Sequence, residues 1–175
     1  SQIENEEKSL EYYESAVEIN VSDRHARNEY GRSLHHFGYI SEAIKQFEIG
    51  LLQPVVMGET ETEILLHINL LNALGDVGRM NQLEKTVRRA DKLITEKYGK
   101  DQVPAVFTWN LALGHLILGE TSKGYEKYRS RFDWDDFTSH KRTFSKPRLE
   151  SINELAGKRL MIWREQGIGD ELTHL

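Results

Sequence analysis

Asparagine side chains are the groups in this sequence whose chemistry and spacing point most directly to binding. Asn69 and Asn110 each stand directly before a leucine and nine residues before a glycine, so they occupy equivalent positions in a repeated pattern. A carboxamide donates and accepts hydrogen bonds, so it can pair with both the N–H and the C=O of a peptide backbone. The two asparagines therefore predict a peptide-binding site. Ordinary bonding to solvent or to a neighbouring turn is the alternative.

Further side chains fall on the same predicted surface when the sequence is aligned on Gly38, Gly78 and Gly119. Glu29 then takes the position that Asn69 and Asn110 hold in the later units. The other members are His25, Asn28, Arg32, His35 and His36 from the first unit, Asn72 and Asp76 from the second, and Val106, Trp109, Leu113 and Ile117 from the third. The predicted peptide-binding residues are Asn28, Arg32, His35, Asn69, Asn72, Trp109 and Asn110. The apolar set from the third unit fits either a peptide or a following domain, and we favour the domain.

Two clusters contain residue types that bind metal ions, but their spacing favours other roles. His25, His35 and His36 carry imidazole, a common metal ligand, yet no two of them are four residues apart and the chain has no cysteine. A polar lining of the predicted surface is the better interpretation. Asp133 and Asp135 imitate the Asp-x-Asp pattern of metal-dependent sugar transferases, but they follow a predicted helix and fit a solvated acidic loop. The sequence therefore predicts neither a metal site nor a cofactor.

The stretch 29–54 contains the unit that the chain repeats, which is two helices joined by a tight turn. Gly38 provides the left-handed residue that ends the first helix. Small residues at Gly31 and Ala43 allow the helix backbones to approach closely, and Phe47 fills the space between them. The repeat is indicated by Ser9, Tyr13 and Ala16, which precede Ala43, Phe47 and Gly50 by one constant separation.

The spacing of apolar residues and glycines predicts one helix followed by three helix pairs. The single helix covers about 3–19, and the second helices of the pairs cover about 41–52, 81–98 and 122–132. The predicted N-caps are Ser22, Ser41, Asn81 and Ser122. After residue 132 the periodicity ends. There, 149–155 has room for a short helix, and 159–163 fits either a short buried strand or a helix face.

This pattern resembles the tetratricopeptide (TPR) repeat, a helix-turn-helix unit whose period of about 34 residues matches that constant separation. The resemblance implies an all-α superhelix of about three repeats, followed by an irregular C-terminal tail with room for one short strand. It also implies that the first helices line a concave groove that holds an extended peptide or a helix. In the TPR region of O-linked N-acetylglucosamine transferase, asparagines at the position of Asn69 and Asn110 grip the peptide backbone. The partner implied here is thus a protein or a peptide.

The C-terminal residues carry a second resemblance. GYEKYRSRF, PRLES and LAGKRLMIWREQGIGDEL occur in the order found in bacterial proteins that join TPR repeats to a glycosyltransferase domain. Such domains are similar to heptosyltransferases and have the GT-B fold. By this resemblance Gly167 and Gly169 form a loop beside the acceptor, and Asp170 is the base that takes the acceptor hydroxyl proton. No donor-sugar pocket is expected in a chain that ends at Leu175, so we expect no catalysis by this chain itself.

Composition and charge exclude several classes of protein. The chain has 175 residues and a net charge of −5, which disfavours nucleic acid as the main partner because phosphate binding needs a basic surface. Cysteine is absent, so disulfides and thiolate metal sites are excluded. No apolar run approaches the roughly 18 residues of a membrane span, and no signal-peptide pattern opens the chain. We therefore expect a cytoplasmic protein without a membrane partner, and the missing initial methionine predicts a piece of a longer chain.

The sequence thus predicts a TPR domain at 1–132, a linker at 133–158, and the truncated start of a Rossmann-like domain at 159–175. The predicted function is binding of a protein or peptide by the repeat groove, as the N-terminal module of a glycosyltransferase-like protein. Two alternatives stay open. The parent protein can transfer a sugar to an acceptor that the groove presents, or the module can form homo-oligomers through an exposed strand edge in the C-terminal tail.

Overall fold

The computed structural model describes residues 2–55, 58–99, 102–135, 143–147, 149 and 151–161. These residues form seven α-helices and two short 3-10 helices, and no strand occurs among them. The predicted all-α class is confirmed. The chain divides into two compact units, Ser1–Trp134 and Asp135–Leu175.

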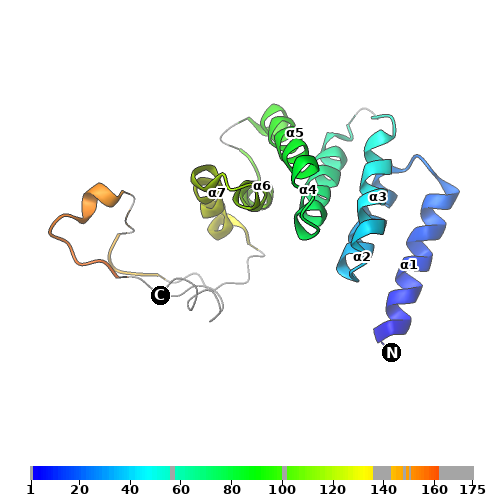
Figure 1. The fold of residues 1–175 in the computed structure, drawn as a ribbon, viewed down its shortest axis with the longest axis horizontal. Coiled ribbons are helices and arrows are strands. Elements are labelled where there is room, and N and C mark those ends of the chain that lie inside the picture. The colour runs from blue at the N-terminus through cyan, green and yellow to red at the C-terminus, as the bar shows by residue number, and fades with distance from the viewer. Residues whose placement is uncertain are drawn as a thin grey trace. The chain divides into compact units, whose positions relative to one another are not determined.

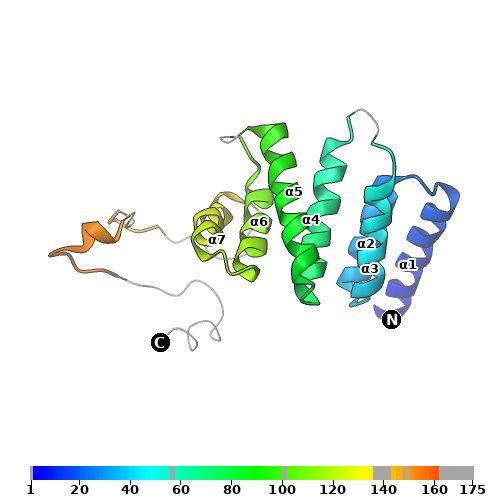
Figure 2. The same cartoon turned by 45° about the horizontal axis from the view of Figure 1, so that its top comes forward.

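The seven α-helices lie in the first unit, where they form a row of neighbouring helices (Figures 1 and 2). Helix α1 (Gln2–Ile19) is followed by three helix pairs. The pairs are α2 (Arg24–His36) with α3 (Ile40–Leu52), α4 (Thr60–Asp76) with α5 (Met80–Tyr98), and α6 (Ala105–Ile117) with α7 (Thr121–Tyr128). The helices of each pair pack on each other, and α3 packs on α4 as α5 packs on α6, so consecutive pairs are in contact. The 3-10 helix η1 (Arg129–Asp133) follows α7 and packs on α6.

A glycine with positive φ ends the first helix of each pair, as the sequence predicts. The φ angle is 87° at Gly38, 68° at Gly78 and 76° at Gly119, in a region that favours glycine because it has no Cβ. At each turn the N–H groups of the glycine and of the next residue donate to carbonyls of the ending helix. Tyr39, for example, donates to the Leu34 carbonyl at 2.8 Å. This Schellman arrangement closes all three helices in the same way.

The predicted N-caps are wrong. The second helix of each pair begins only two residues after the glycine, so Ser41, Asn81 and Ser122 lie inside its first turn. The residue after each glycine takes the N-cap position and makes no side-chain cap, while its N–H donates to the preceding helix. Ser22 is displaced as well, since the Asp23 side chain caps α2 by accepting from the Ala26 N–H at 2.9 Å.

The first pair closes around the ring of Phe47. Phe47 and Ala43 are both fully buried. A Cβ added to Gly31 would lie 2.4 Å from Cε1 of Phe47, which is closer than any real carbon contact. The close approach predicted at Gly31 is therefore an approach of the α2 backbone to the Phe47 ring of α3.

A buried ionic cluster joins the first pair to the second. The Arg24 side chain on α2 is almost completely buried and donates from Nε to the Gly50 carbonyl at 3.2 Å. Its guanidinium also lies 3.8 Å from the Glu63 carboxylate on α4, which binds Arg89 of α5 at 2.9 Å. His67 follows Glu63 by one helical turn and is largely buried, and this burial lowers its pKa from 6.5 to about 4.

The burial of His67 predicts an acid-sensitive fold. Because the folded-state pKa lies below the ordinary value, His67 favours folding above about pH 6.5, and this contribution is lost as the pH falls through about 4. Between those limits the loss amounts to about 3 kcal/mol. We expect His67→Gln to reduce the difference in unfolding free energy between neutral and acidic pH by that amount. Urea titrations of both proteins at each pH check this, and identical pH profiles would contradict it.

Glu120 fastens the turn of the third pair to α5. Its carboxylate accepts hydrogen bonds from the Arg88 guanidinium of α5, and it lies 2.7 Å from Nδ1 of the buried His115. The hydrogen bond from Arg88, followed by that from His115, lowers the pKa of Glu120 to about 2. Glu120 therefore stays ionised under all mild conditions, and α5 remains tied to the α6–α7 turn.

In the second unit the described helix is η2 (Ile152–Leu155), which lies within the stretch predicted to hold a short helix. Residues 159–161 belong to neither a helix nor a strand. The rest of the predicted strand, 162–163, lies outside the described residues.

Candidate peptide-binding face

The first helices of the three pairs, α2, α4 and α6, pack consecutively on one another. We call the side that they form the first-helix face. The sequence-predicted residues on it that are at least partly exposed are His25, Glu29, Arg32, His35, His36, Asn69, Asn72, Asp76, Val106, Trp109, Leu113 and Ile117. They run from polar groups on α2 and α4 to apolar groups on α6.

Asn28 and Asn69 bond to each other across α2 and α4. The Asn69 amide donates to Oδ1 of Asn28 at 2.8 Å. Asn28 is buried, and its own amide donates to the Glu29 carboxylate at 2.9 Å. Asn28 therefore serves the contact between the helices, whereas Asn69 is only half-buried and keeps part of its side chain accessible.

A second asparagine pair crosses from α4 to α6. The Asn72 amide donates to Oδ1 of Asn110 at 2.8 Å, and the Asn110 amide donates to the Val106 carbonyl at 2.7 Å. Asn110 is 7% exposed, so its carboxamide bonds to other groups of the protein and is not accessible to a ligand. Asn69 and Asn110, which hold equivalent positions in the sequence, thus differ in exposure and in the direction of their hydrogen bonds.

Two carboxamide oxygens on α4 remain open. The Oδ1 atoms of Asn69 and Asn72 accept no hydrogen bond from the part of the chain that the structure describes, while both amides are held by the neighbouring helices. Asn69 and Asn72 lie three residues apart and share one face of the helix. Because their amides are fixed, the two oxygens form a prepared pair of acceptors for N–H groups of a ligand.

The charged groups around these asparagines pair among themselves. Arg32 binds Glu29 at 2.9 Å within α2, and His35 contacts the Asp76 carboxylate at 2.7 Å across α2 and α4. Each pair joins a basic group to an acidic one. The carboxylates of Glu29 and Asp76 therefore already have hydrogen-bond partners within the face.

The α6 end of the first-helix face is aromatic and aliphatic. Trp109 packs against Trp134, with ring centroids 5.3 Å apart. Ile117 lies against the backbone of α4, where a Cβ at Gly75 would approach its Cδ1 to 2.9 Å. Trp134 belongs to the same unit as Trp109, so the indole of Trp134 covers part of Trp109.

Sequence reasoning missed the buried cluster around Glu63. Its signal was present, since Glu63 and His67 stand one turn apart in a helix that is otherwise rich in isoleucine and leucine. The side chains that face them, Arg24 and Arg89, come from α2 and α5, which lie on either side of α4 in the sequence. The helical pattern of α4 alone does not identify those partners.

The remaining candidate residues are either separate or outside the described part. His25 and His36 are exposed on α2 and join no metal-like group, because no cluster of three or more potential ligands occurs among the described residues. Asp133 and Asp135 are exposed. Gly167, Gly169 and Asp170 lie outside the described residues. None of the helices among the residues described is both long and apolar enough to cross a membrane.

The chain was also compared with known proteins. Neither the protein-family models nor the curated proteins gave a match to it.

Proposed function

We propose that this chain is a TPR-type module that binds an extended segment of another protein on its first-helix face. The observation that carries the proposal is the pair of open carboxamide oxygens of Asn69 and Asn72. Both lie on one face of α4, and both are oriented by hydrogen bonds from their own amides to neighbouring helices. Acceptors held in this way lose little conformational freedom when a ligand binds.

The chemistry of the surrounding face favours a peptide backbone as the ligand. An extended segment presents N–H groups that the two oxygens can accept, and its side chains can reach the apolar surface at Trp109 and Leu113. Arg32 and His35 already contact the carboxylates of Glu29 and Asp76, so neither side chain needs a charged ligand as its partner. Recognition of backbone with one apolar anchor is therefore the mode that these residues support.

The sugar-transfer alternative depends on Gly167, Gly169 and Asp170, which lie outside the described residues. As part of the same proposal, the chain serves as the binding module of a glycosyltransferase-like parent. Peptide binding tests the helical part of this proposal and not sugar transfer.

Peptides selected on the whole chain from a displayed random library provide the probe. Their affinities are measured by calorimetry for the wild type, for Asn69→Ala/Asn72→Ala and for Trp109→Ala. Each lost hydrogen bond is expected to cost about 1 kcal/mol, or about fivefold in affinity, so the double variant should bind about 25-fold more weakly. Asn81→Ala, an exposed asparagine at the start of α5, is the matched control and should bind normally.

Thermal melts of the same variants separate binding from folding, because both asparagines also donate to buried partners. Equal affinities for the wild type and the folded double variant would contradict the proposed site. Failure to select any peptide would contradict the proposed function itself.

A further inference from the structure

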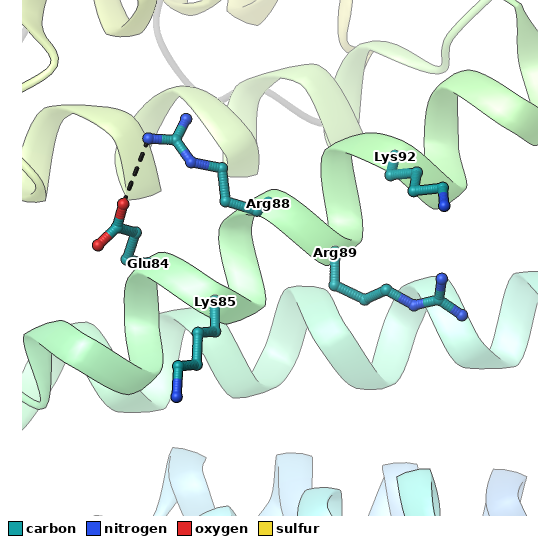
Figure 3. A pocket seen from close by; sticks show the side chains of 5 residues that line it. All are labelled: Glu84, Lys85, Arg88, Arg89 and Lys92. Atoms are coloured by element: carbon teal, nitrogen blue, oxygen red, sulfur yellow. Dashed lines mark hydrogen bonds and ion pairs between the residues drawn. The ribbon is translucent and has the colours of Figure 1, made fainter.

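Helix α5 carries a basic stripe on its solvent side. Lys85, Arg88, Arg89 and Lys92 are all exposed, and each of the last three follows an earlier member by three or four residues. Residues three and four apart share one face of a helix. Figure 3 shows these side chains along α5, where they line a shallow depression together with Glu84. Four cationic groups therefore gather on the surface of a chain whose net charge is −5.

Three of these four cations already have carboxylate partners. Arg88 pairs with Glu120 and with Glu84, and Arg89 pairs with Glu63. Each guanidinium keeps further N–H groups for another acceptor. Lys92 lies 3.7 Å from Glu96, at the outer limit of an ion pair. Lys85 has no ion-pair partner among the described residues. The stripe thus combines two guanidiniums held by glutamates with two exposed ammonium groups.

Helix α1 has the opposite charge, with six glutamates and one lysine. Glu11, Glu14 and Glu18 are exposed, whereas Val17 is buried. Burial raises the pKa of Tyr30 on α2, and the charges of Glu14 and Glu18 raise it further, so the negative charge of these two carboxylates also reaches α2. The only described helix that α1 packs on is α2, which leaves its acidic side facing solvent.

We propose that the acidic stripe of α1 in one copy docks onto the basic stripe of α5 in a second copy. The spacings agree, since the separations of three and four residues in Glu11, Glu14 and Glu18 recur in Lys85, Arg88 and Lys92. Each triplet spans about 10 Å along its helix. One exposed ion pair contributes little, but several pairs in register act together. Because two different surfaces meet, the contact is heterologous, and each copy retains its other stripe for further association.

Sedimentation equilibrium of the whole chain tests this contact. We expect association at about 0.1 M salt and dissociation at about 1 M salt, where the screening length is only about 3 Å. Lys85→Glu/Lys92→Glu and Glu11→Lys/Glu18→Lys should each stay monomeric at the lower salt concentration, because like charges then face each other. An equimolar mixture of the two variants should associate again, since each reversed stripe then meets a complementary one.

A matched control reverses two lysines elsewhere, in Lys45→Glu/Lys146→Glu, which has the same net charge as the α5 variant and should associate like the wild type. Circular dichroism of every variant confirms that the helices are retained. A wild type that is monomeric at low salt overturns the proposal. The partner of the basic stripe would then be an acidic segment of another protein. Association that survives both double variants also overturns it and locates the contact elsewhere in the chain. A mixture that stays monomeric excludes direct pairing of the two stripes.

Discussion

Replacement of Phe47 by alanine is expected to lower the free energy of unfolding by about 3–5 kcal/mol. The Phe47 side chain is fully buried between α2 and α3, and its removal leaves a cavity that two helices already in contact cannot close. Urea unfolding followed by circular dichroism measures the loss. Phe37→Ala is the matched control, because Phe37 is only partly buried and its replacement should cost clearly less.

Substitution of Gly31 tests the same contact between α2 and the Phe47 ring. In the wild type, Gly31→Ala forces a methyl group to within 2.4 Å of the Phe47 ring, and such overpacking costs about 1–3 kcal/mol. In the Phe47→Ala background the same methyl enters empty space, and alanine then favours the helix by about 1 kcal/mol over glycine. The effect of Gly31→Ala should therefore change sign between the two backgrounds. Equal effects in both would show that α2 and α3 do not meet at this contact.

Replacement of Glu63 by leucine is expected to cost about 3 kcal/mol or more. The Arg24 side chain is 1% exposed, and Glu63 is the carboxylate nearest to it. Without Glu63 the Arg24 guanidinium keeps the Gly50 carbonyl and a carboxylate of Glu59 at 3.9 Å. Neither compensates for the desolvation of a full charge, so the folded state loses stability.

Two further variants, Arg24→Met and Arg24→Met/Glu63→Leu, distinguish the loss of the ion pair from the loss of packing. Arg24→Met should cost less than Glu63→Leu, because Glu63 then keeps its hydrogen bond to Arg89, a side chain that is 46% exposed. In Arg24→Met/Glu63→Leu both buried charges are replaced by apolar groups, and most of the stability should return. Urea titrations at neutral pH give the three values. Additive losses in the double variant would show that the two groups do not interact.

The asparagine pairs show where prediction of the candidate site from sequence stops. Alignment on the turn glycines makes Asn69 and Asn110 equivalent, and equivalent positions on α4 and α6 point in similar directions rather than toward each other. Contacts between neighbouring helices must then join non-equivalent positions. Asn69 bonds to Asn28 and Asn72 bonds to Asn110, and neither separation in sequence equals that of the corresponding turn glycines. These offsets depend on how each pair is rotated against the next.

The sequence by itself determined the all-α class and the turns between paired helices, because each of these features is local. A residue with positive φ calls for glycine, and Gly38, Gly78 and Gly119 therefore mark their turns regardless of what packs around them. The tertiary structure alone decided which polar groups form hydrogen bonds inside the protein and which can still bind a ligand. Asn110 and Glu63 are buried by side chains from other helices, while Asn69 and Asn72 keep free oxygens because their neighbours hold only the amides. Burial and hydrogen-bond partners arise from the relative placement of helices that are far apart in the sequence, and no pattern within one helix specifies that placement.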